Sequence, residues 1–524
     1  MRNPVYTLVL LATVLRAVAA PTTPAQTETQ PNQTIQESIA TSTDIRNQHM
    51  GVCTHFIRKK GMKHWDPKTY MPALAELGVG WIRDEVLWSQ IEVEKGVYKM
   101  RWQDMEWINL AHENNIKIIL TVAGGSSFYG EDSFDPEGYA KLCAYLAEEL
   151  KGKVDVFEVQ NEPFHHYASH YGEGTKKGGD WYGLTNGTLD VQGWVDHYRI
   201  TLNKAADAVK AVNPDAKVIG LGSFPAINYR QIEAGLSENV DGITAHPYSY
   251  RVVPEIMPYK DNEKTIEKNG GRRVTDEHGT FASFIEMQLD FSAKHNGPDE
   301  MWLTEWGYSS FRERWEGDPN KWGGNYWGFN DHAVAVYAQR RFVEGLGLGV
   351  EVSVYYSLLD DDYSQDDPLK AESNSENHFG LITKDGERKP VYFAIQKVAK
   401  LTDGFTVSDE LDYEIVKGQP RPDSRPVNWW NGSTIEALDE ICNYQFKDAN
   451  GDNVLAVWSM ERVGDRSARA ANITIDVPFE GTKVEVTDLM TGKVYEAFTE
   501  DKDGKLFLPH FAVPPHVVLI RLVR

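Results

Sequence analysis

Short apolar runs alternate with longer amphipathic stretches between about residues 50 and 400 of the chain. The runs are rich in valine and isoleucine and predict buried strands at 51–56, 79–83, 116–123, 154–160, 216–221, 240–245, 300–304 and 349–356. Asp66-Pro67 and Asp135-Pro136 are typical helix starts, and further helices are expected near 191–212, 281–295 and 331–346. Alternating strands and helices favour a parallel sheet, and eight such units fit a closed (β/α)8 TIM barrel.

An open, doubly wound sheet is the competing arrangement for this alternation. Such sheets normally carry a glycine-rich phosphate-binding turn after the first strand, and no GxGxxG motif follows Val52. The barrel is therefore the preferred prediction.

After a helix expected near 391–401, the pattern changes to short strand-like runs such as 453–458 and 483–487. Asn450-Gly451, Thr491-Gly492 and Asp503-Gly504 are turn signals between these runs. We therefore expect an α/β chain with a catalytic barrel at 46–403 and an antiparallel β-sandwich at 404–524. Because no aromatic platform stands out in the second domain, a packed structural appendage is preferred there over a glycan-binding module.

The first 45 residues have the composition of segments that precede a folded domain. Residues 1–20 contain Arg2, an apolar run at 6–15 and small residues at 17–20, which is typical of a secretory signal peptide. The run is about half the length of a membrane-spanning helix, so we expect secretion to an extracellular or periplasmic space. Residues 21–45 are rich in Thr, Pro, Gln and Asn and predict a disordered linker.

The chain carries a formal net charge of −23 at pH 7. An acidic surface repels nucleic acid and anionic membranes, so neither is expected as a partner. Three widely spaced cysteines predict buried thiols, and a disulfide between Cys53 and Cys143 is the alternative. The sequence does not indicate an oligomeric state.

Two glutamates carry the candidate chemistry. Glu162, in Val-Gln-Asn-Glu-Pro, follows the fourth predicted strand, and Glu305, in Trp-Leu-Thr-Glu-Trp-Gly, follows the seventh. In a barrel of parallel strands both side chains belong at the same mouth. Cleavage of a glycosidic bond needs one protonated acid and one ionised carboxylate on either side of that bond, which this pair supplies.

Polar side chains at other strand ends fit the same site. Asn161 is placed to bind the 2-hydroxyl of a sugar, and Arg83, at the end of the second strand, to hold a carboxylate ionised. His246 and Tyr248, after the sixth strand, are expected to donate to the nucleophile or line the sugar subsite. Tyr355 or Tyr356, at the end of the eighth strand, is expected to form the floor of the sugar subsite.

Aromatic residues are concentrated in segment 306–331, which begins directly after Glu305. Because sugar rings pack their CH-rich faces on indoles, Trp306 and Trp327 are candidates for a wall of a glycan cleft, and Trp88 is a secondary one. The competing interpretation is a hydrophobic cluster that orders the loop itself. His166 and His170 stand at helical i, i+4 spacing, but without an HExxH glutamate we expect neither a metal nor another cofactor.

Taken together, the strand-end motifs resemble those of the clan A retaining glycoside hydrolases. The motifs are Gly80-Trp-Ile-Arg83, Gln160-Asn-Glu-Pro163, Ala245-His-Pro-Tyr248, Leu303-Thr-Glu-Trp306 and Tyr356-Ser-Leu-Leu-Asp360, within residues 50–400. Family 39 is the most similar, with family 5 and related families close behind. The resemblance implies that Glu162 is the acid/base, that Glu305 is the nucleophile, and that Arg83, His246 and Tyr248 support it.

The resemblance also implies hydrolysis of a poly- or oligosaccharide through a glycosyl-enzyme intermediate. The tryptophan that these families often carry after the eighth strand is replaced by Tyr355-Tyr356, which leaves the sugar open. Two alternatives share the same residues: a transglycosylase and a barrel that binds glycan without turnover.

Overall fold

The structure is a computed structural model that describes residues 44–60, 65–171, 193–257, 263–311, 326–361, 372–418, 427–428, 434–435, 440–463 and 468–523. The predicted signal peptide at 1–20 and nearly all of the predicted linker at 21–45 lie outside the described residues. Residues Ser42–Arg524 form one compact unit.

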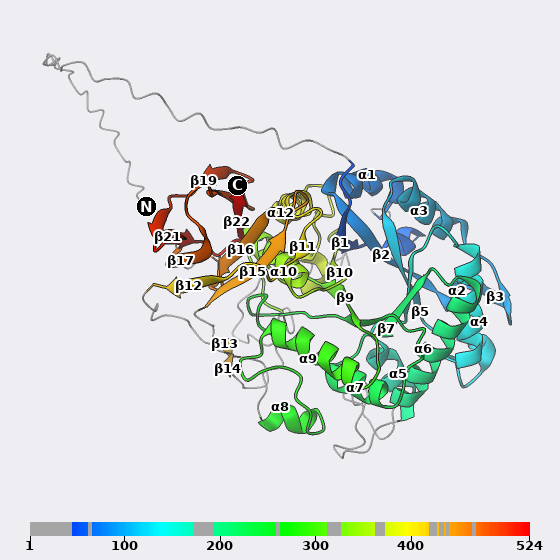
Figure 1. Cartoon of the computed structure of the whole chain (residues 1–524). Helices are drawn as coiled ribbons and strands as arrows, with labels where there is room; N and C mark the ends of the chain where they lie inside the picture. Colours follow the sequence, from blue (N-terminus) through cyan, green and yellow to red (C-terminus); the bar gives the residue numbers. More distant parts are fainter. Residues whose placement is uncertain are drawn as a thin grey trace, which may run out of the picture. The chain divides into compact units, whose positions relative to one another are not determined.

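Eight parallel strands close into a barrel in the order β1-β10-β9-β8-β7-β6-β5-β2 (Figure 1). Val52 pairs with Tyr355 on one side and with Ile82 on the other, which closes the ring. The predicted (β/α)8 barrel is therefore confirmed. The strands are β1 (Asn47–Cys53), β2 (Val79–Leu87), β5 (Lys117–Ala123), β6 (Val156–Val159), β7 (Lys217–Leu221), β8 (Gly242–Ala245), β9 (Glu300–Trp306) and β10 (Val352–Tyr355).

Helices separate the strands, and several begin and end where local chemistry dictates. The Asp135 side chain accepts a hydrogen bond from the Gly138 amide at the start of α4, and α1 ends at Gly78 in the left-handed conformation. The helices are α1 (Pro67–Leu77), α2 (Trp88–Ile91), α3 (Trp102–Glu113), α4 (Pro136–Glu149), α5 (Pro163–Tyr171), α6 (Gly193–Val212), α7 (Pro225–Glu233), α8 (Glu263–Lys268), α9 (Phe281–Lys294), α10 (Asp331–Gly347) and α12 (Pro390–Leu401). Short 3-10 turns are η1 (Phe56–Lys60), η2 (Ser127–Tyr129) and η3 (Ser375–His378), and β3 (Glu92–Glu94) pairs with β4 (Val97–Tyr98).

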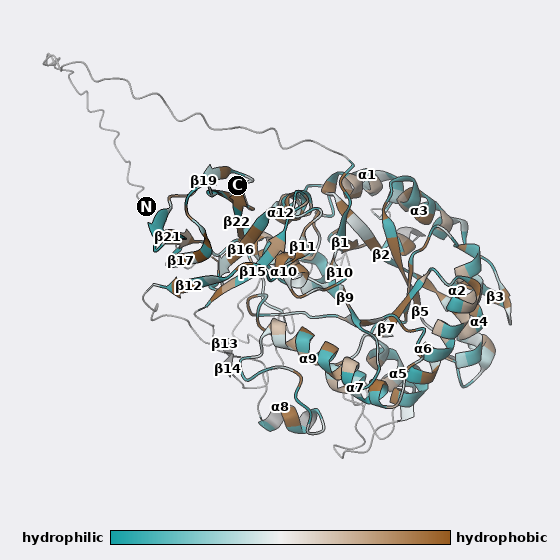
Figure 2. Ribbon diagram, in the orientation of Figure 1, coloured by the Kyte–Doolittle hydropathy of each residue, from teal (hydrophilic) through white to brown (hydrophobic). Residues whose placement is uncertain are grey.

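Hydrophobic residues face inward in this arrangement. Helices such as α6, α7 and α9 carry both polar and apolar residues, as expected for helices with one face on the barrel (Figure 2). Helix α10 differs because nearly all of its residues are buried. Among the described helices, none combines the length and the continuous apolar character that crossing a bilayer requires.

The C-terminal part is an antiparallel sandwich of a six-stranded sheet, β11-β15-β16-β22-β18-β19, and a four-stranded sheet, β12-β17-β21-β20. One core cluster takes residues from both sheets, including Leu455, Ile473, Leu508 and Ile520. The predicted sandwich is confirmed. Its strands are β11 (Thr406–Val407), β12 (Tyr413–Lys417), β15 (Ile441–Lys447), β16 (Asn453–Ser459), β17 (Arg469–Pro478), β18 (Lys483–Asp488), β19 (Val494–Glu496), β20 (Glu500–Lys502), β21 (Lys505–Val513) and β22 (Val518–Val523), beside a separate pair, β13 (Val427–Asn428) and β14 (Thr434–Ile435).

Candidate active site

The two glutamates lie at carboxyl ends of barrel strands. Glu305 is part of β9, and Glu162 follows β6 after a turn in which Gln160 and Glu162 both have positive φ, 66° and 41°. Left-handed backbone is costly for residues other than glycine and concentrates at functional sites. The Gln160 amide holds this turn through two 2.9 Å hydrogen bonds with the backbone of Gly124.

Arg83 is the cation at the centre of the site. Its Nε donates to Glu158 at 2.7 Å, one Nη to Asn161 Oδ1 at 2.8 Å, and the other Nη to Glu305 Oε2 at 3.1 Å. One guanidinium therefore positions groups from β6, from the turn after β6 and from β9. Burial alone would lower the pKa of Arg83, but the charges of Glu158 and Glu305 outweigh it and hold that pKa well above its ordinary value.

Glu305 receives a hydrogen bond on each carboxylate oxygen. Tyr248 Oη donates to Oε1 at 2.7 Å, and Arg83 donates to Oε2. Charge-assisted bonds of this kind stabilise the carboxylate form. Glu305 is therefore held in one orientation at the mouth of the barrel.

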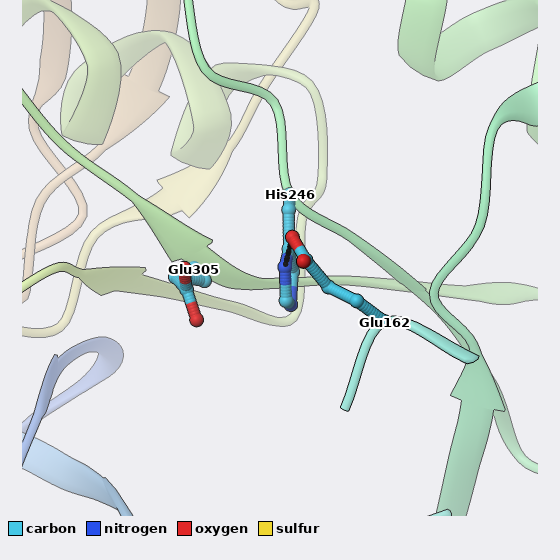
Figure 3. A group of neighbouring side chains, drawn as sticks. All are labelled: Glu162, His246 and Glu305. Atoms are coloured by element: carbon cyan, nitrogen blue, oxygen red, sulfur yellow. Dashed lines mark hydrogen bonds and ion pairs between the residues drawn. The ribbon is translucent and has the colours of Figure 1, made fainter. Parts of the chain in front are cut away.

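Glu162 has different partners. His246 Nδ1 lies 2.9 Å from its Oε1 (Figure 3). His165 Nε2 lies 3.2 Å from its Oε2. Burial would raise the pKa of Glu162, but the hydrogen bonds and charges of His165 and His246 outweigh it and lower that pKa below its usual range. Conversely, although burial disfavours the charged imidazole, Glu305 and Glu162 raise the pKa of His246. Glu162 and His246 thus share one proton, which favours the imidazole.

Glu162, His246 and Glu305 have ligand atoms that all lie within 4.8 Å of one another. Within the described part of the chain, these are the residues whose spacing would suit a metal ion. The oxygens of Glu305 already accept hydrogen bonds from Arg83 and Tyr248, and those of Glu162 contact His246 and His165. This arrangement suits proton transfer at Glu162 beside the carboxylate of Glu305. In the i, i+4 histidine pair, the ring of His170 bonds to the backbone carbonyl of Glu131 at 3.0 Å.

The structure adds a partner for His246. Sequence reasoning expected it to donate to Glu305 or to line the sugar subsite; its hydrogen bond goes to Glu162, while a ring nitrogen also lies within 4.8 Å of a Glu305 oxygen. Tyr248 is two residues further along the chain and reaches the other glutamate, because the turn after β8 directs the two side chains to opposite members of the pair.

Two predicted cleft residues are core residues instead. Trp306 is 1% exposed, donates from Nε1 to Ser353 Oγ at 2.8 Å, and packs edge-on against Phe342. Trp88 is 0% exposed and packs edge-on against Tyr139 of α4. Neither indole offers a face to a sugar in this structure.

Of the remaining aromatic candidates, Tyr356 interacts with Glu305. Tyr356 is buried beside the rings of His55 and Phe379, and burial together with the charge of Glu305 holds its pKa well above the ordinary value. Tyr355 is turned away, with its hydroxyl on the carbonyl of Tyr308. Trp327 is half-buried, and its amide donates to the carbonyl of Tyr250 at 3.3 Å. The other tryptophans of segment 306–331, at 315 and 322, lie outside the described residues.

Sequence reasoning missed Glu158, which lies four residues before Glu162 in β6. Its carboxylate accepts from Arg83 and, at 2.5 Å, from Thr121 Oγ1. Burial would raise the pKa of Glu158, but Arg83 and Thr121 help to hold it below the ordinary value. The available signal was a charged residue inside the apolar run Val-Phe-Glu-Val, which needs a buried partner as Arg83 does.

The fold is similar to that of solved glycoside hydrolases. A family 39 glycoside hydrolase from Bacteroides cellulosilyticus WH2 has a TM-score of 0.61 and 17% identity, over 92% of this chain and 82% of that chain. A family 5 glycoside hydrolase from Bacteroides vulgatus ATCC 8482 has a TM-score of 0.53 and 12% identity, over 91% of this chain and 88% of that one. No protein-family model and no curated protein matches the sequence. The expected resemblance to families 39 and 5 is thus confirmed at the level of the fold.

Proposed function

We propose that this protein is a retaining β-glycoside hydrolase that cleaves a poly- or oligosaccharide by double displacement. The observation that carries the proposal is the spacing of the two glutamates, whose carboxylates each place an oxygen within 4.8 Å of the other. Carboxyl groups about 5 Å apart suit attack by one of them on the sugar, whereas inverting enzymes need about 6.5–9.5 Å to admit a water.

The partners of each glutamate support a division of labour. Glu305, with Arg83 and Tyr248 on its oxygens, is an anion aimed for attack on the anomeric carbon. Glu162, with His246, lies in a unit that holds one exchangeable proton. That proton passes from His246 Nδ1 to Glu162 and from Glu162 to the leaving oxygen. Glu162 afterwards takes a proton from the water that releases the covalent sugar. Asn161, fixed by Arg83, is placed for the 2-hydroxyl.

Replacing the nucleophile tests the assignment. Glu305→Gln is expected to remove turnover of β-linked aryl glycosides and oligosaccharides, with a loss of at least about a thousandfold in kcat. The matched control is Glu300→Gln at the opposite end of β9, where the carboxylate pairs with Lys217. Because that end of the barrel lies away from the mouth, Glu300→Gln is expected to retain activity. Near-normal turnover by Glu305→Gln would overturn the proposal.

The stereochemistry of the product provides a second, independent test. Proton NMR of the sugar first released from a β-glycoside is expected to show the β-anomer, because two inversions restore the configuration. A panel of β-glucans, xylans and mannans then identifies the sugar. An α-anomer as the first product would exclude double displacement.

We also infer that the chain is secreted, on the strength of residues 1–20. Expression in a secreting host is expected to deliver a mature protein that lacks this segment, as measured by mass spectrometry of its N-terminus. Retention of residues 1–20 on a cell-associated product would contradict the inference.

A further inference from the structure

The loop that follows β8 carries both His246 and Tyr248, and we call residues 246–257 the β8 loop. From Tyr248 to Met257 all of its residues except Tyr250 are buried. The amide of Met257 donates to Gly279 at 2.7 Å, and Tyr308 Oη donates to the carbonyl of Val252 at 3.2 Å. The geometry of both catalytic glutamates therefore depends on a packed segment without regular secondary structure.

Two neighbouring arginines of α10 bind this loop. Arg341 donates to Ser249 Oγ at 2.7 Å and to the carbonyl of Pro254, while Arg340 forms a bidentate pair with the carboxylate of Glu255. The side chains of Arg340 and Glu255 are 0% and 2% exposed. A charged pair buried to this extent is retained only where every donor and acceptor is satisfied.

The sandwich completes the set of partners around Glu255. Trp458, on β16, donates from Nε1 to Glu255 Oε1 at 2.7 Å, and its side chain is 0% exposed. Arg340 also donates to the carbonyl of Glu461, which follows β16, at 2.9 Å. One carboxylate of the β8 loop is thus the point where the loop, α10 and the sandwich meet.

We propose that the sandwich positions the β8 loop for catalysis through the bond from Trp458 to Glu255, which makes both of them positioning residues. The catalytic part of this inference rests on the proposed glycosidase function. Together with the pair to Arg340, the bond fixes the rotation of the Glu255 carboxylate. Because Glu255 is part of the β8 loop, this fixes the position of the loop and so of His246, which bonds to Glu162, and of Tyr248, which bonds to Glu305.

Trp458→Phe tests the inference because it removes the indole N–H and keeps an aromatic ring in the same space. The matched control is Gln339→Met. It removes the 2.9 Å bond from Gln339 Nε2 to the carbonyl of Leu489, a buried contact between α10 and the sandwich that does not involve the loop. Each variant loses one buried hydrogen bond across the same boundary, so a similar small fall in Tm is expected for both.

Hydrogen–deuterium exchange of peptides covering residues 246–257 measures the anchoring directly. We expect exchange there to become faster by about tenfold or more in Trp458→Phe and to stay unchanged in Gln339→Met. For hydrolysis, Trp458→Phe is expected to lower kcat between about tenfold and a hundredfold, because small displacements of catalytic groups have effects of this size. KM should change by less than about twofold, and the pH profile of kcat should shift, since His246 moves relative to Glu162.

Equal exchange and equal kcat in the two variants would overturn the positioning role. If Trp458→Phe fails to fold, Trp458→Leu provides the same test, since it also removes the indole N–H that donates to Glu255; unchanged exchange of the β8 loop there would also overturn the positioning role. A wild type without activity on any glycoside overturns the proposed function alone, because exchange still reports the anchoring.

Discussion

Single side chains at the barrel mouth serve more than one neighbour. Arg83 binds Glu158, Asn161 and Glu305 at once, so its own position is fixed from three directions. His246 and His165 contact Glu162, whereas Arg83 and Tyr248 contact Glu305, so the environments of the two glutamates differ although they are close. That difference is what separates an anion from a proton carrier.

His246 is expected to set the alkaline side of the pH profile. Its pKa is raised above 6.5, against the effect of burial, by Glu305 and Glu162, so the shared proton persists to higher pH than a lone carboxyl would hold it. His246→Gln leaves Glu162 alone, and the alkaline limb of kcat/KM should therefore move to lower pH. The measurement is kcat/KM between pH 4 and 9.

The matched control for that profile is His165→Gln. His165 also contacts Glu162, but at 3.2 Å and with 41% of its side chain exposed, so solvent screens it and a smaller shift is expected. An alkaline limb that stays in place in His246→Gln would show that the imidazole does not hold the proton.

At the level of elements, the local sequence pattern predicts where the strands lie, but it does not predict whether Trp306 and Trp88 are exposed or buried. The β-branched runs predicted all eight strands, and the Asp-Pro helix starts predicted α1 and α4. The amphipathic stretches predicted α6, α9, α10 and α12 close to their observed bounds. Trp306 was misplaced because successive strand residues point to opposite faces. With Glu305 in the mouth, Trp306 must face α10, where Phe342 receives it. Trp88 was misplaced because only tertiary packing brings Tyr139 of α4 against it.

Contacts between distant elements were beyond sequence reasoning for a different reason. The partner of Glu255 on the sandwich is separated from it by 203 residues, and neither residue lies in a recognisable motif. A single buried glutamate predicts that it has a partner, but not which element supplies it.

Two glycines, one in α10 and one just after β9, are expected to respond oppositely to alanine. In Gly345, inside α10, an added Cβ meets nothing closer than Leu303 at 3.8 Å, so Gly345→Ala should stabilise the fold by about 0.5–1 kcal/mol. In Gly307, just after β9, the Cβ would lie 2.2 Å from the carbonyl oxygen of Tyr356. Gly307→Ala should destabilise by about 1–3 kcal/mol and lower kcat, because the ends of β9 and β10 must separate.

Urea unfolding of both variants, with kcat of each, checks the pair. A stabilised and fully active Gly307→Ala would mean that the two strand ends are not held together as described.

On the scale of the whole molecule, buried carboxyl groups link stability to pH. Burial raises the pKa of Asp84 to about 7, and burial with the charge of Glu255 raises that of Glu344 to about 8. The folded state therefore binds these protons up to higher pH than the unfolded state does. Stability is full below the ordinary carboxyl pKa and is lost as pH rises through the folded values.

Glu344→Gln should flatten this dependence. Each such carboxyl contributes a slope of up to about 1.4 kcal/mol per pH unit between roughly pH 5 and 8, and glutamine has no proton to lose. Tm measured across that range should fall less steeply in Glu344→Gln than in the wild type. Glu113→Gln, at an exposed position on α3, is the control and should retain the wild-type slope; identical slopes in all three proteins would exclude Glu344 as the source.

The contacts between the sandwich and the β8 loop also impose an order on biosynthesis. During translation, β8 and Glu255 are synthesised long before Trp458 and Glu461. The barrel closes only after β10 is available to pair with β1. Until then a growing chain exposes a carboxylate and an arginine that the finished protein buries. A nascent barrel without its last strands is thus an incomplete polar cluster as well as an open sheet, and the unpaired edges of such a sheet make the growing chain prone to aggregation.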